Sequence, residues 1–212
     1  MNRVKAISLL LFFSTATFAT YCDISAPKYP AYNKTLDTVG DSITWWQHGE
    51  KFRCIMLDKG LEFDFVGSFV DAYGYYHDGH GGDTTSTVLS RMESIPISDN
   101  YFVLIGTNDH ISPRITVNNI LLISERLSMK SARSRVFIST LLPKKDAFSS
   151  ISTQINELLR TSTFCPQCEL VDLGMYVESL PQWETLFTDG IHPNADGYNV
   201  MTDYLTNYFK SK

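Results

Sequence analysis

The spacing of apolar positions along the chain predicts five β-strands. Residues 101–105 form a continuous apolar run, which is typical of a strand buried on both faces of a parallel sheet. Residues 136–142 form a second run of this kind. Residues 61–66 alternate between apolar and polar side chains, as a strand with one buried face does. Two short segments, residues 36–39 and 170–173, complete the set.

Helical spacing separates these strands. Pro113 stands near the start of the longest helical segment, and proline is favoured at the first helical position. The other predicted helices span residues 43–57, 84–95, 150–159 and 195–209. Thr84 or Thr85 is available to cap the helix over 84–95. Strands that alternate with helices predict one α/β domain with a parallel sheet of about five strands and right-handed crossovers.

Polar clusters follow the predicted strands. In α/β sheets, reactive groups lie beyond the carboxyl ends of the strands. The four clusters are residues 40–42 (GDS), 79–85 (GHGGDTT), 106–109 (GTND) and 189–193 (DGIHP). Each cluster alone is more often a turn than a site, but their joint occurrence points to one active site.

The clusters supply the groups that acyl transfer requires. The Ser42 hydroxyl is a weak nucleophile until a base takes its proton, and His192 can be that base. Asp189 lies three residues before His192 and can fix the imidazole tautomer. The Ser42 N–H, a glycine N–H from residues 79–85 and the Asn108 amide are candidate donors to an oxyanion.

These blocks resemble those of the SGNH (GDSL-type) hydrolase family, over roughly residue 36 to the C-terminus. The matching residues are Ser42 in VGDSIT, Gly82 in GGDTT, Asn108 in GTND and His192 in DGIHPN. The resemblance implies a flavodoxin-like sheet with helices on both faces, and ester hydrolysis through an acyl-serine intermediate. The reaction that the resemblance implies needs no metal or organic cofactor. Gly82 fits the oxyanion position better than Gly81, because Asp83 and Thr84 follow it as in the family.

A finer resemblance connects the chain to acetyl-xylan-type carbohydrate esterases of this class. It rests on Phe52-Arg53, Leu57, residues 63–68 (FDFVGS) and residues 77–80 (HDGH). The chain departs from that pattern at Trp45-Trp46, where a glycine is typical, and at Gly81, where a serine is typical. The resemblance implies a small acyl group, acetyl above all, on a carbohydrate.

Several further side chains are candidates for the substrate pocket. Trp45 and Trp46 follow the nucleophile, and aromatic faces suit sugar C–H surfaces, although at least one of the pair is expected to pack inside the fold. Asp41 and His80 are the other candidates, as neighbours of Ser42 and of the oxyanion glycine. His77, His80 and His110 are expected on the surface or in loops, because their spacing is a poor zinc signal.

Two alternatives use the same residues. One is a lysophospholipase or lipase-like esterase, which the absence of an evident hydrophobic lid disfavours. The other is a non-catalytic carbohydrate-binding module on a hydrolase fold, which would require a broken set of catalytic residues. An α/β-hydrolase is disfavoured, because Thr44 stands where the nucleophile elbow needs a glycine.

The N-terminus has the pattern of a secretory signal peptide over residues 1–19. Arg3 and Lys5 precede an apolar stretch too short to span a membrane, and small residues end it. Residues 20–35 are predicted to form an extended lead-in, and residues 36–212 the hydrolase domain. The sequence therefore predicts a secreted or periplasmic protein. Cys22 also allows a lipidated N-terminus, which the bulky Tyr21 disfavours.

The four cysteines favour disulfides in an exported chain. Cys165–Cys168 is the preferred local pair and Cys22–Cys54 the other, while redox and zinc sites are disfavoured by their context.

Length and charge narrow the function further. A chain of 212 residues can bury one full core. Its formal net charge of −5 offers no basic face for nucleic acid, and it disfavours anionic membrane surfaces. The resemblance implies a small-molecule or polysaccharide ester as the partner, and no stable membrane insertion is expected after signal cleavage. The oligomeric state is left open.

Overall fold

The computed structural model describes residues 21–24 and 32–212. The predicted signal peptide and half of the predicted lead-in lie outside these residues. No helix within the described part of the chain is long and apolar enough to cross a membrane.

A seven-stranded, mostly parallel sheet forms the centre of the domain, in the order β3-β4-β1-β5-β6-β7, with β2 also paired to β1. The strands are β1 (Thr35–Gly40), β2 (Asp64–Val66), β3 (Phe69–Val70), β4 (Tyr76–Gly79), β5 (Asn100–Leu104), β6 (Arg135–Ser139) and β7 (Cys168–Val171). Among the strands of the described residues, β3 alone runs antiparallel to its neighbour.

One side of β1 is shared by two short strands. Its first half, from Thr35, pairs with β2, whereas Val39 and Gly40 pair with Asp78 and Gly79 of β4. On the other side, Gly40 pairs with Leu104 of β5. The carboxyl ends of β4, β1 and β5 therefore meet at one edge of the sheet, where three of the polar clusters begin.

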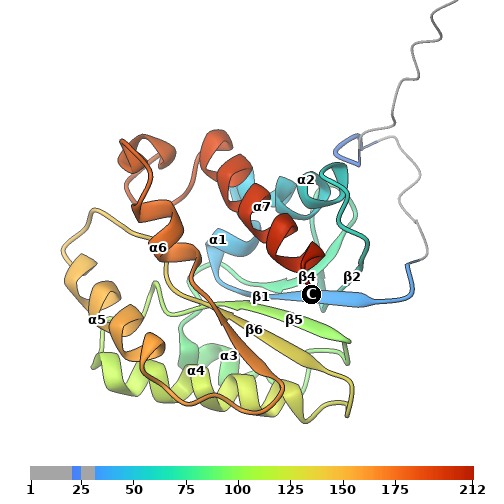
Figure 1. Ribbon diagram of the computed structural model, residues 1–212, viewed down its shortest axis with the longest axis horizontal. Helices are drawn as coiled ribbons and strands as arrows, with labels where there is room; N and C mark the ends of the chain where they lie inside the picture. The colour runs from blue at the N-terminus through green and yellow to red at the C-terminus, as the bar shows by residue number, and fades with distance from the viewer. Residues whose placement is uncertain (1–20, 25–31) are drawn as a thin grey trace, which may run out of the picture.

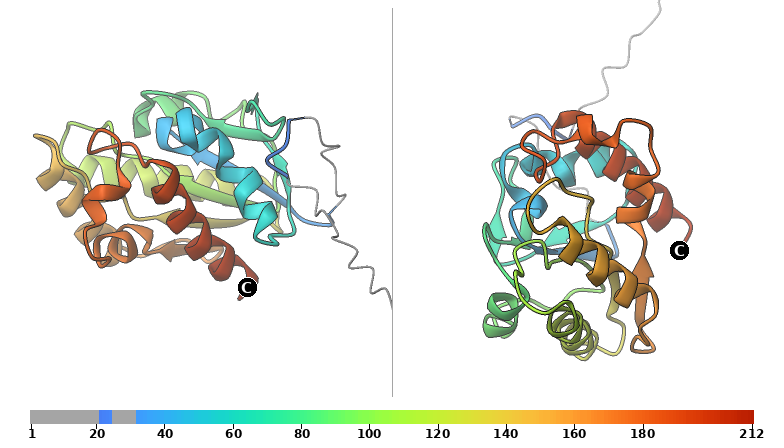
Figure 2. Two further views of the ribbon diagram at one scale, coloured as in Figure 1. Left: turned by 90° about the horizontal axis from the view of Figure 1, so that it is seen from above. Right: turned by 90° about the vertical axis from the view of Figure 1, so that its left-hand side faces the viewer.

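Helices cover both faces of the sheet (Figure 1). They are α1 (Ser42–Trp45), α2 (Phe52–Asp58), α3 (Thr85–Ser90), α4 (Pro113–Ser128), α5 (Ser149–Arg160), α6 (Leu173–Glu178) and α7 (Ala195–Lys210). In Figure 1, α1, α2, α6 and α7 lie above the sheet, and α3 and α4 lie below it. The side views in Figure 2 place α5 next to α4, away from α7.

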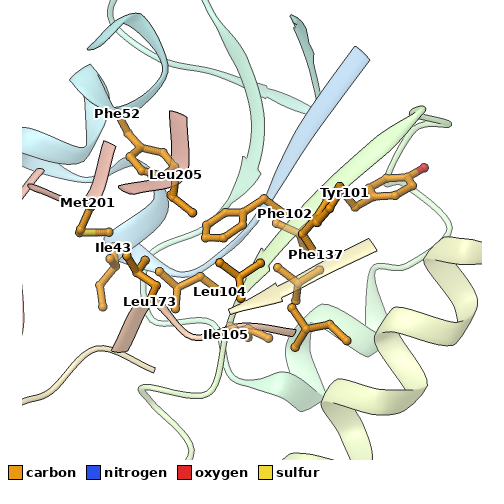
Figure 3. Packing of buried hydrophobic residues seen from close by; sticks show 14 of the residues in the cluster. Ile43, Phe52, Tyr101, Phe102, Leu104, Ile105, Phe137, Leu173, Met201 and Leu205 are labelled. Carbon is orange, nitrogen blue, oxygen red and sulfur yellow. The ribbon is translucent and has the colours of Figure 1, made fainter. Parts of the chain in front are cut away.

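The core fills both interfaces between sheet and helices. Phe102 of β5 and Phe137 of β6 are buried in the sheet, and both rings contact Phe209 of α7. Figure 3 shows these strand residues in the same buried cluster as Leu205 and Met201 of α7. The continuous apolar runs of β5 and β6 reflect burial on both faces, as expected for central parallel strands.

The structure corrects the predicted bounds of two helices. The helix predicted over residues 43–57 is broken into α1, a 3₁₀ turn at Gln47–Lys51 and α2, because Trp46 is extended and Gln47 has φ of +51°. The helix predicted over 84–95 ends at Ser90, although Thr84 does cap it.

The sheet also has seven strands and not five, because β3 and β4 were not predicted. His77, expected at the surface or in a loop, is a buried residue of β4.

Both expected disulfides are present. Cys22–Cys54 ties the start of the described chain to α2, and Cys165–Cys168 closes the turn before β7. No free cysteine occurs among the described residues.

Candidate active site

Ser42 begins α1 directly after β1. The turn between them has room only for a glycine at position 40. A Cβ on Gly40 would lie 2.0 Å from Thr44 Oγ1 and 2.5 Å from the Leu104 carbonyl oxygen. Asp41 caps the new helix by accepting a hydrogen bond from the Ile43 N–H at 2.9 Å. This tight turn places the Ser42 hydroxyl beyond the carboxyl edge of the sheet.

Ser42, His192 and Asp189 form a continuous hydrogen-bonded chain. Ser42 Oγ lies 2.9 Å from His192 Nε2, and His192 Nδ1 lies 2.7 Å from Asp189 Oδ2. The second carboxylate oxygen, Oδ1, accepts the backbone N–H groups of Ile191 and His192 at 3.0 and 2.8 Å. The structure therefore brings together the three residues that the sequence selected for these roles.

The loop that carries Asp189 and His192 is tied at both of its ends. Thr188 N–H donates to the His192 carbonyl at 2.8 Å, and Phe187 forms an isolated bridge with Pro193. Asn194 then caps α7 by accepting the Gly197 N–H at 3.0 Å. The imidazole is thus presented from a short, closed loop at the start of a long helix.

Two buried side chains hold α1 in place. Tyr198 of α7 donates its hydroxyl to the Ile43 carbonyl at 2.7 Å. Arg53 donates to the Thr44 carbonyl at 2.9 Å and forms a fully buried ion pair with Asp71 at 2.7 Å. The segment after Ser42 is therefore fixed from the histidine helix on one side and from α2 on the other.

Gly82 and Asn108 come from the neighbouring strand ends. Gly82 has φ of +80°, a region that favours glycine, and a Cβ there would meet no heavy atom within 4 Å. Asn108 Nδ2 donates to the Asp83 carbonyl at 2.9 Å, so the amide is tied to the residue after Gly82. An amide nitrogen carries two hydrogens, and this contact uses one. A Cβ on Gly81 would also meet open space, so the surroundings do not choose between the two glycines.

Sequence reasoning missed the side chains that support these two loops. Arg91 binds Asp83 Oδ2 at 2.8 Å and Asp78 Oδ1 at 3.0 Å, which holds the glycine loop to β4. Asp109 is buried and accepts the Thr85 N–H at 2.9 Å, which ties the Asn108 loop to the start of α3. The only sequence signal for these side chains was that Asp83 and Asp109 lie within the polar clusters.

Two carboxyl groups at the site have shifted pKa values of opposite direction. Full burial raises the pKa of Asp41 to about 7, against the lowering effects of the Ile43 N–H and of His192. Partial burial raises the pKa of Asp189, but hydrogen bonds from the backbone and ring of His192 and from Ile191 outweigh it and lower the pKa to about 2. Asp189 is therefore a carboxylate at neutral pH, whereas Asp41 titrates near it.

The candidate pocket residues separate into buried and exposed groups. Trp45 is half-buried and stacks on His77, with ring centroids 5.9 Å apart. Trp46 is 39% exposed and sets its ring edge-on to His192 at 4.8 Å. His80 is exposed and lies 5.7 Å from the half-exposed ring of Phe69. Trp46 thus borders the imidazole, and the His80–Phe69 pair borders the glycine loop.

Within the described ranges, no group of three or more His, Cys, Asp or Glu side chains could hold a metal ion. Of the three histidines considered as ligands, His77 lies in the core with Nδ1 accepting the Gly79 N–H. Burial lowers the pKa of His77 to about 3, so it is neutral at physiological pH.

A mostly parallel sheet that joins a serine, a histidine and an aspartate in one hydrogen-bonded chain, beside a glycine loop and an asparagine, defines a serine ester hydrolase of the SGNH type. The sequence pattern of the GDSL-like lipase/acylhydrolase family matches residues 38–200, and the chain belongs to this family. No curated protein matches the chain by sequence.

Solved structures of the same class share the fold. A carbohydrate esterase family 3 structure from Talaromyces cellulolyticus aligns with a TM-score of 0.68 and 19% identity, over 84% of this chain and 97% of that one. A member of the lipolytic protein G-D-S-L family from Veillonella parvula aligns with a TM-score of 0.68 and 20% identity, over 84% and 99%. A family 3 carbohydrate esterase from Clostridium thermocellum aligns with a TM-score of 0.64 and 18% identity, over 84% and 96%.

Proposed function

We propose that the protein is an exported esterase that removes small acyl groups, above all acetyl, from carbohydrates. The observation that carries the proposal is the hydrogen-bonded chain from Ser42 through His192 to Asp189 at the carboxyl edge of the sheet. Ester hydrolysis follows from the family, whereas the acyl group, the alcohol, the residue roles and the export belong to the proposal.

In the proposed reaction, Ser42 Oγ attacks the ester carbonyl as His192 Nε2 takes its proton. The developing negative charge on the carbonyl oxygen accepts hydrogen bonds from the Ser42 N–H, the Gly82 N–H and the second Asn108 amide hydrogen. His192 then gives its proton to the departing alcohol, which leaves an acyl-serine. Water, deprotonated by the same imidazole, releases the acid and restores Ser42.

The exposure of the site supports a bulky alcohol such as a carbohydrate. The side chains of His192 and Asp189 are 20% and 50% exposed, so the catalytic loop opens directly to solvent. Exposed Trp46 lies beside the His192 ring, and the His80–Phe69 pair borders the glycine loop. Aromatic side chains of this kind offer apolar faces to sugar rings, and carbohydrate esterases are among the structures that share this fold.

Export is supported by two independent features. Residues 1–19 have the composition of a signal peptide, and disulfides such as Cys22–Cys54 persist mainly in oxidising compartments. Residues 1–19 are proposed to be removed, which leaves Cys22 near the new N-terminus.

The test is acetate release from acetylated xylan, measured beside hydrolysis of aryl esters of increasing acyl length, for the wild type and Ser42→Ala. We expect acetate release and a preference for the shortest acyl chains, both abolished by Ser42→Ala. Serine-dependent activity that rises with acyl length, with acetylated sugar untouched, would assign a lipid esterase. A folded protein without activity on any ester would favour the non-catalytic binding module.

A further inference from the structure

The loop between β6 and α5 contains a buried lysine that the proposed reaction does not use. Lys144 is only 7% exposed. Its Nζ donates to the Thr107 carbonyl at 3.0 Å and pairs with Asp146 Oδ2 at 3.1 Å. Burial of an ammonium group is costly unless such partners compensate for the lost water. A lysine in a loop ordinarily extends into solvent, so the burial of Lys144 indicates a specific contact.

The contact is directed at the candidate oxyanion segment. The Thr107 carbonyl and the Asn108 backbone nitrogen belong to the same planar peptide unit. A donor bound to this oxygen therefore fixes the position of the Asn108 backbone. One residue beyond Asp109, His110 stacks on Phe148 with ring centroids 3.7 Å apart. Residues 143–148 therefore hold the Asn108 segment from both sides.

The same loop also contacts the segment that carries the base. Lys145 N–H donates to the Gly190 carbonyl at 2.8 Å, between Asp189 and His192. A single loop thus spans the oxyanion segment and the Asp189–His192 segment, which are far apart in the sequence. Its position sets the distance between the asparagine amide and the imidazole.

We propose that Lys144 is a positioning residue, which aligns the Asn108 amide with the oxyanion by holding the Thr107 carbonyl. The inference rests on the proposed role of Asn108 in ester hydrolysis. Lys144 touches neither substrate nor the reacting atoms in this scheme. Its effect passes through Asn108, and a small displacement of a catalytic group is enough to cost a large factor in rate.

The first comparison uses Lys144→Met, which keeps an unbranched apolar side chain only one atom shorter and removes the donor. We expect kcat on an acetyl aryl ester to fall by about 10- to 100-fold, somewhat less than the loss of an oxyanion donor itself, with KM changed by less than about twofold. Lys144→Arg, which keeps a cationic donor, should recover most of the rate. Lys59→Met is the matched control, because Lys59 also binds a backbone carbonyl and a carboxylate, those of Asn199 and Asp203 in α7.

The decisive measurement is a double-mutant cycle with Asn108→Ala. If Lys144 acts through Asn108, Lys144→Met should lower kcat in the wild type and change it less than about threefold in the Asn108→Ala background. Equal reductions in both backgrounds would show that Lys144 supports the fold in general, and would overturn the proposal. An unchanged kcat in the wild-type background would overturn it as well. Should Lys144→Met fail to fold, Asp146→Asn weakens the same contact from its more exposed end and is carried through the same cycle.

A second readout does not depend on the natural ester. A fluorophosphonate reacts with an activated serine, and its phosphoryl oxygen, which gains negative charge as the serine attacks, uses the same donors as the ester oxyanion. The rate of Ser42 labelling should fall with Lys144→Met and should again be insensitive to it when Asn108 is alanine. Labelling with this pattern but without acetate release would reject the carbohydrate substrate and keep the positioning role. A wild type that neither hydrolyses esters nor labels at Ser42 would reject both.

Discussion

Asp189 performs two separate structural tasks with its two oxygens. Oδ2 accepts a hydrogen bond from His192 Nδ1 at 2.7 Å, and Oδ1 accepts hydrogen bonds from the backbone N–H groups of Ile191 and His192. The first contact fixes which ring nitrogen carries the proton, and the second fixes the backbone from which the ring projects. Together they hold the pKa of Asp189 at about 2, against the opposing effect of its partial burial.

Asp189→Asn is expected to separate these tasks. An asparagine can still accept the backbone N–H groups through its oxygen, but it cannot stabilise a charged imidazole. We expect kcat to fall by about 100- to 10,000-fold with little change in KM, the lower end reflecting the exposure of this carboxylate. Steady-state kinetics on an aryl acetate measure it, with exposed Asp196→Asn as the control. A kcat within twofold of the wild type would contradict the role assigned to Asp189.

Asp41 should make stability depend on pH. Its pKa is raised from 3.8 to about 7 in the folded protein, mainly by burial. Between these values the folded state binds the proton more tightly than the unfolded chain, so this group stabilises the fold fully below pH 3.8. That contribution, on the order of 4 kcal/mol, is lost as the pH rises through 7.

The Asp41→Asn variant removes this titration and keeps the cap on Ile43. Urea unfolding at pH 4 and pH 8 should show that the variant loses less stability than the wild type over this interval. The difference between the two proteins isolates Asp41 from the other carboxyl groups. A difference that is the same at both pH values would mean that Asp41 is ionised throughout.

At the scale of elements, the turn from β1 into α1 depends on close backbone approach. Gly40→Ala would place a methyl group 2.5 Å from the Leu104 carbonyl of the neighbouring strand and against Thr44. We expect a loss of about 2 kcal/mol or more in the free energy of unfolding, because neither strand can move aside. Gly81→Ala, whose added carbon meets nothing within 4 Å, is the matched stability control. Equal stabilities of the two variants would contradict the tight packing of this turn.

The elements that the sequence predicted well are those whose pattern has a single physical cause. Residues 101–104 of β5 and 136–138 of β6 are apolar because they are buried on both faces of the sheet, and α4 begins at its proline because that position needs no N–H. The GDSL resemblance gave the family and the class of reaction. It also selected Ser42, His192 and Asp189, whose roles are still predictions although the three side chains lie in contact.

What the sequence did not reveal depends on tertiary contacts. The break at Trp46 and Gln47 follows from a positive φ that no residue pattern marks. β4 mixes a tyrosine, a histidine, an aspartate and a glycine, and its His77 and Asp78 are buried by neighbours distant in sequence. Lys144 lies in a Lys-Lys pair, which reads as exposed charge until the fold places it against Thr107.

At the scale of the whole molecule, the two disulfides close loops of very different length. Cys22–Cys54 joins residues 32 positions apart, and Cys165–Cys168 joins residues three positions apart. The entropy that a crosslink removes from the unfolded chain grows with loop length, to about 3–4 kcal/mol for the first and about 1.5 kcal/mol for the second. The first also anchors the N-terminal segment to α2.

The paired alanine variants test this difference. Cys22→Ala/Cys54→Ala should lose more free energy of unfolding than Cys165→Ala/Cys168→Ala, measured in urea under non-reducing conditions. Each double variant serves as the control for the other, since both remove two sulfur atoms. A larger loss from the short loop would show that contacts around β7, and not loop entropy, dominate.

The base and its carboxylate partner lie three residues apart on one closed loop, whereas the nucleophile lies 150 residues from the histidine. Heating that loosens the packing of α7 against α1 would therefore separate serine from imidazole while the imidazole kept its aspartate. Thermal inactivation of such an enzyme should precede unfolding, and it should be reversible on cooling, since the rest of the fold stays intact and can return the serine to the imidazole.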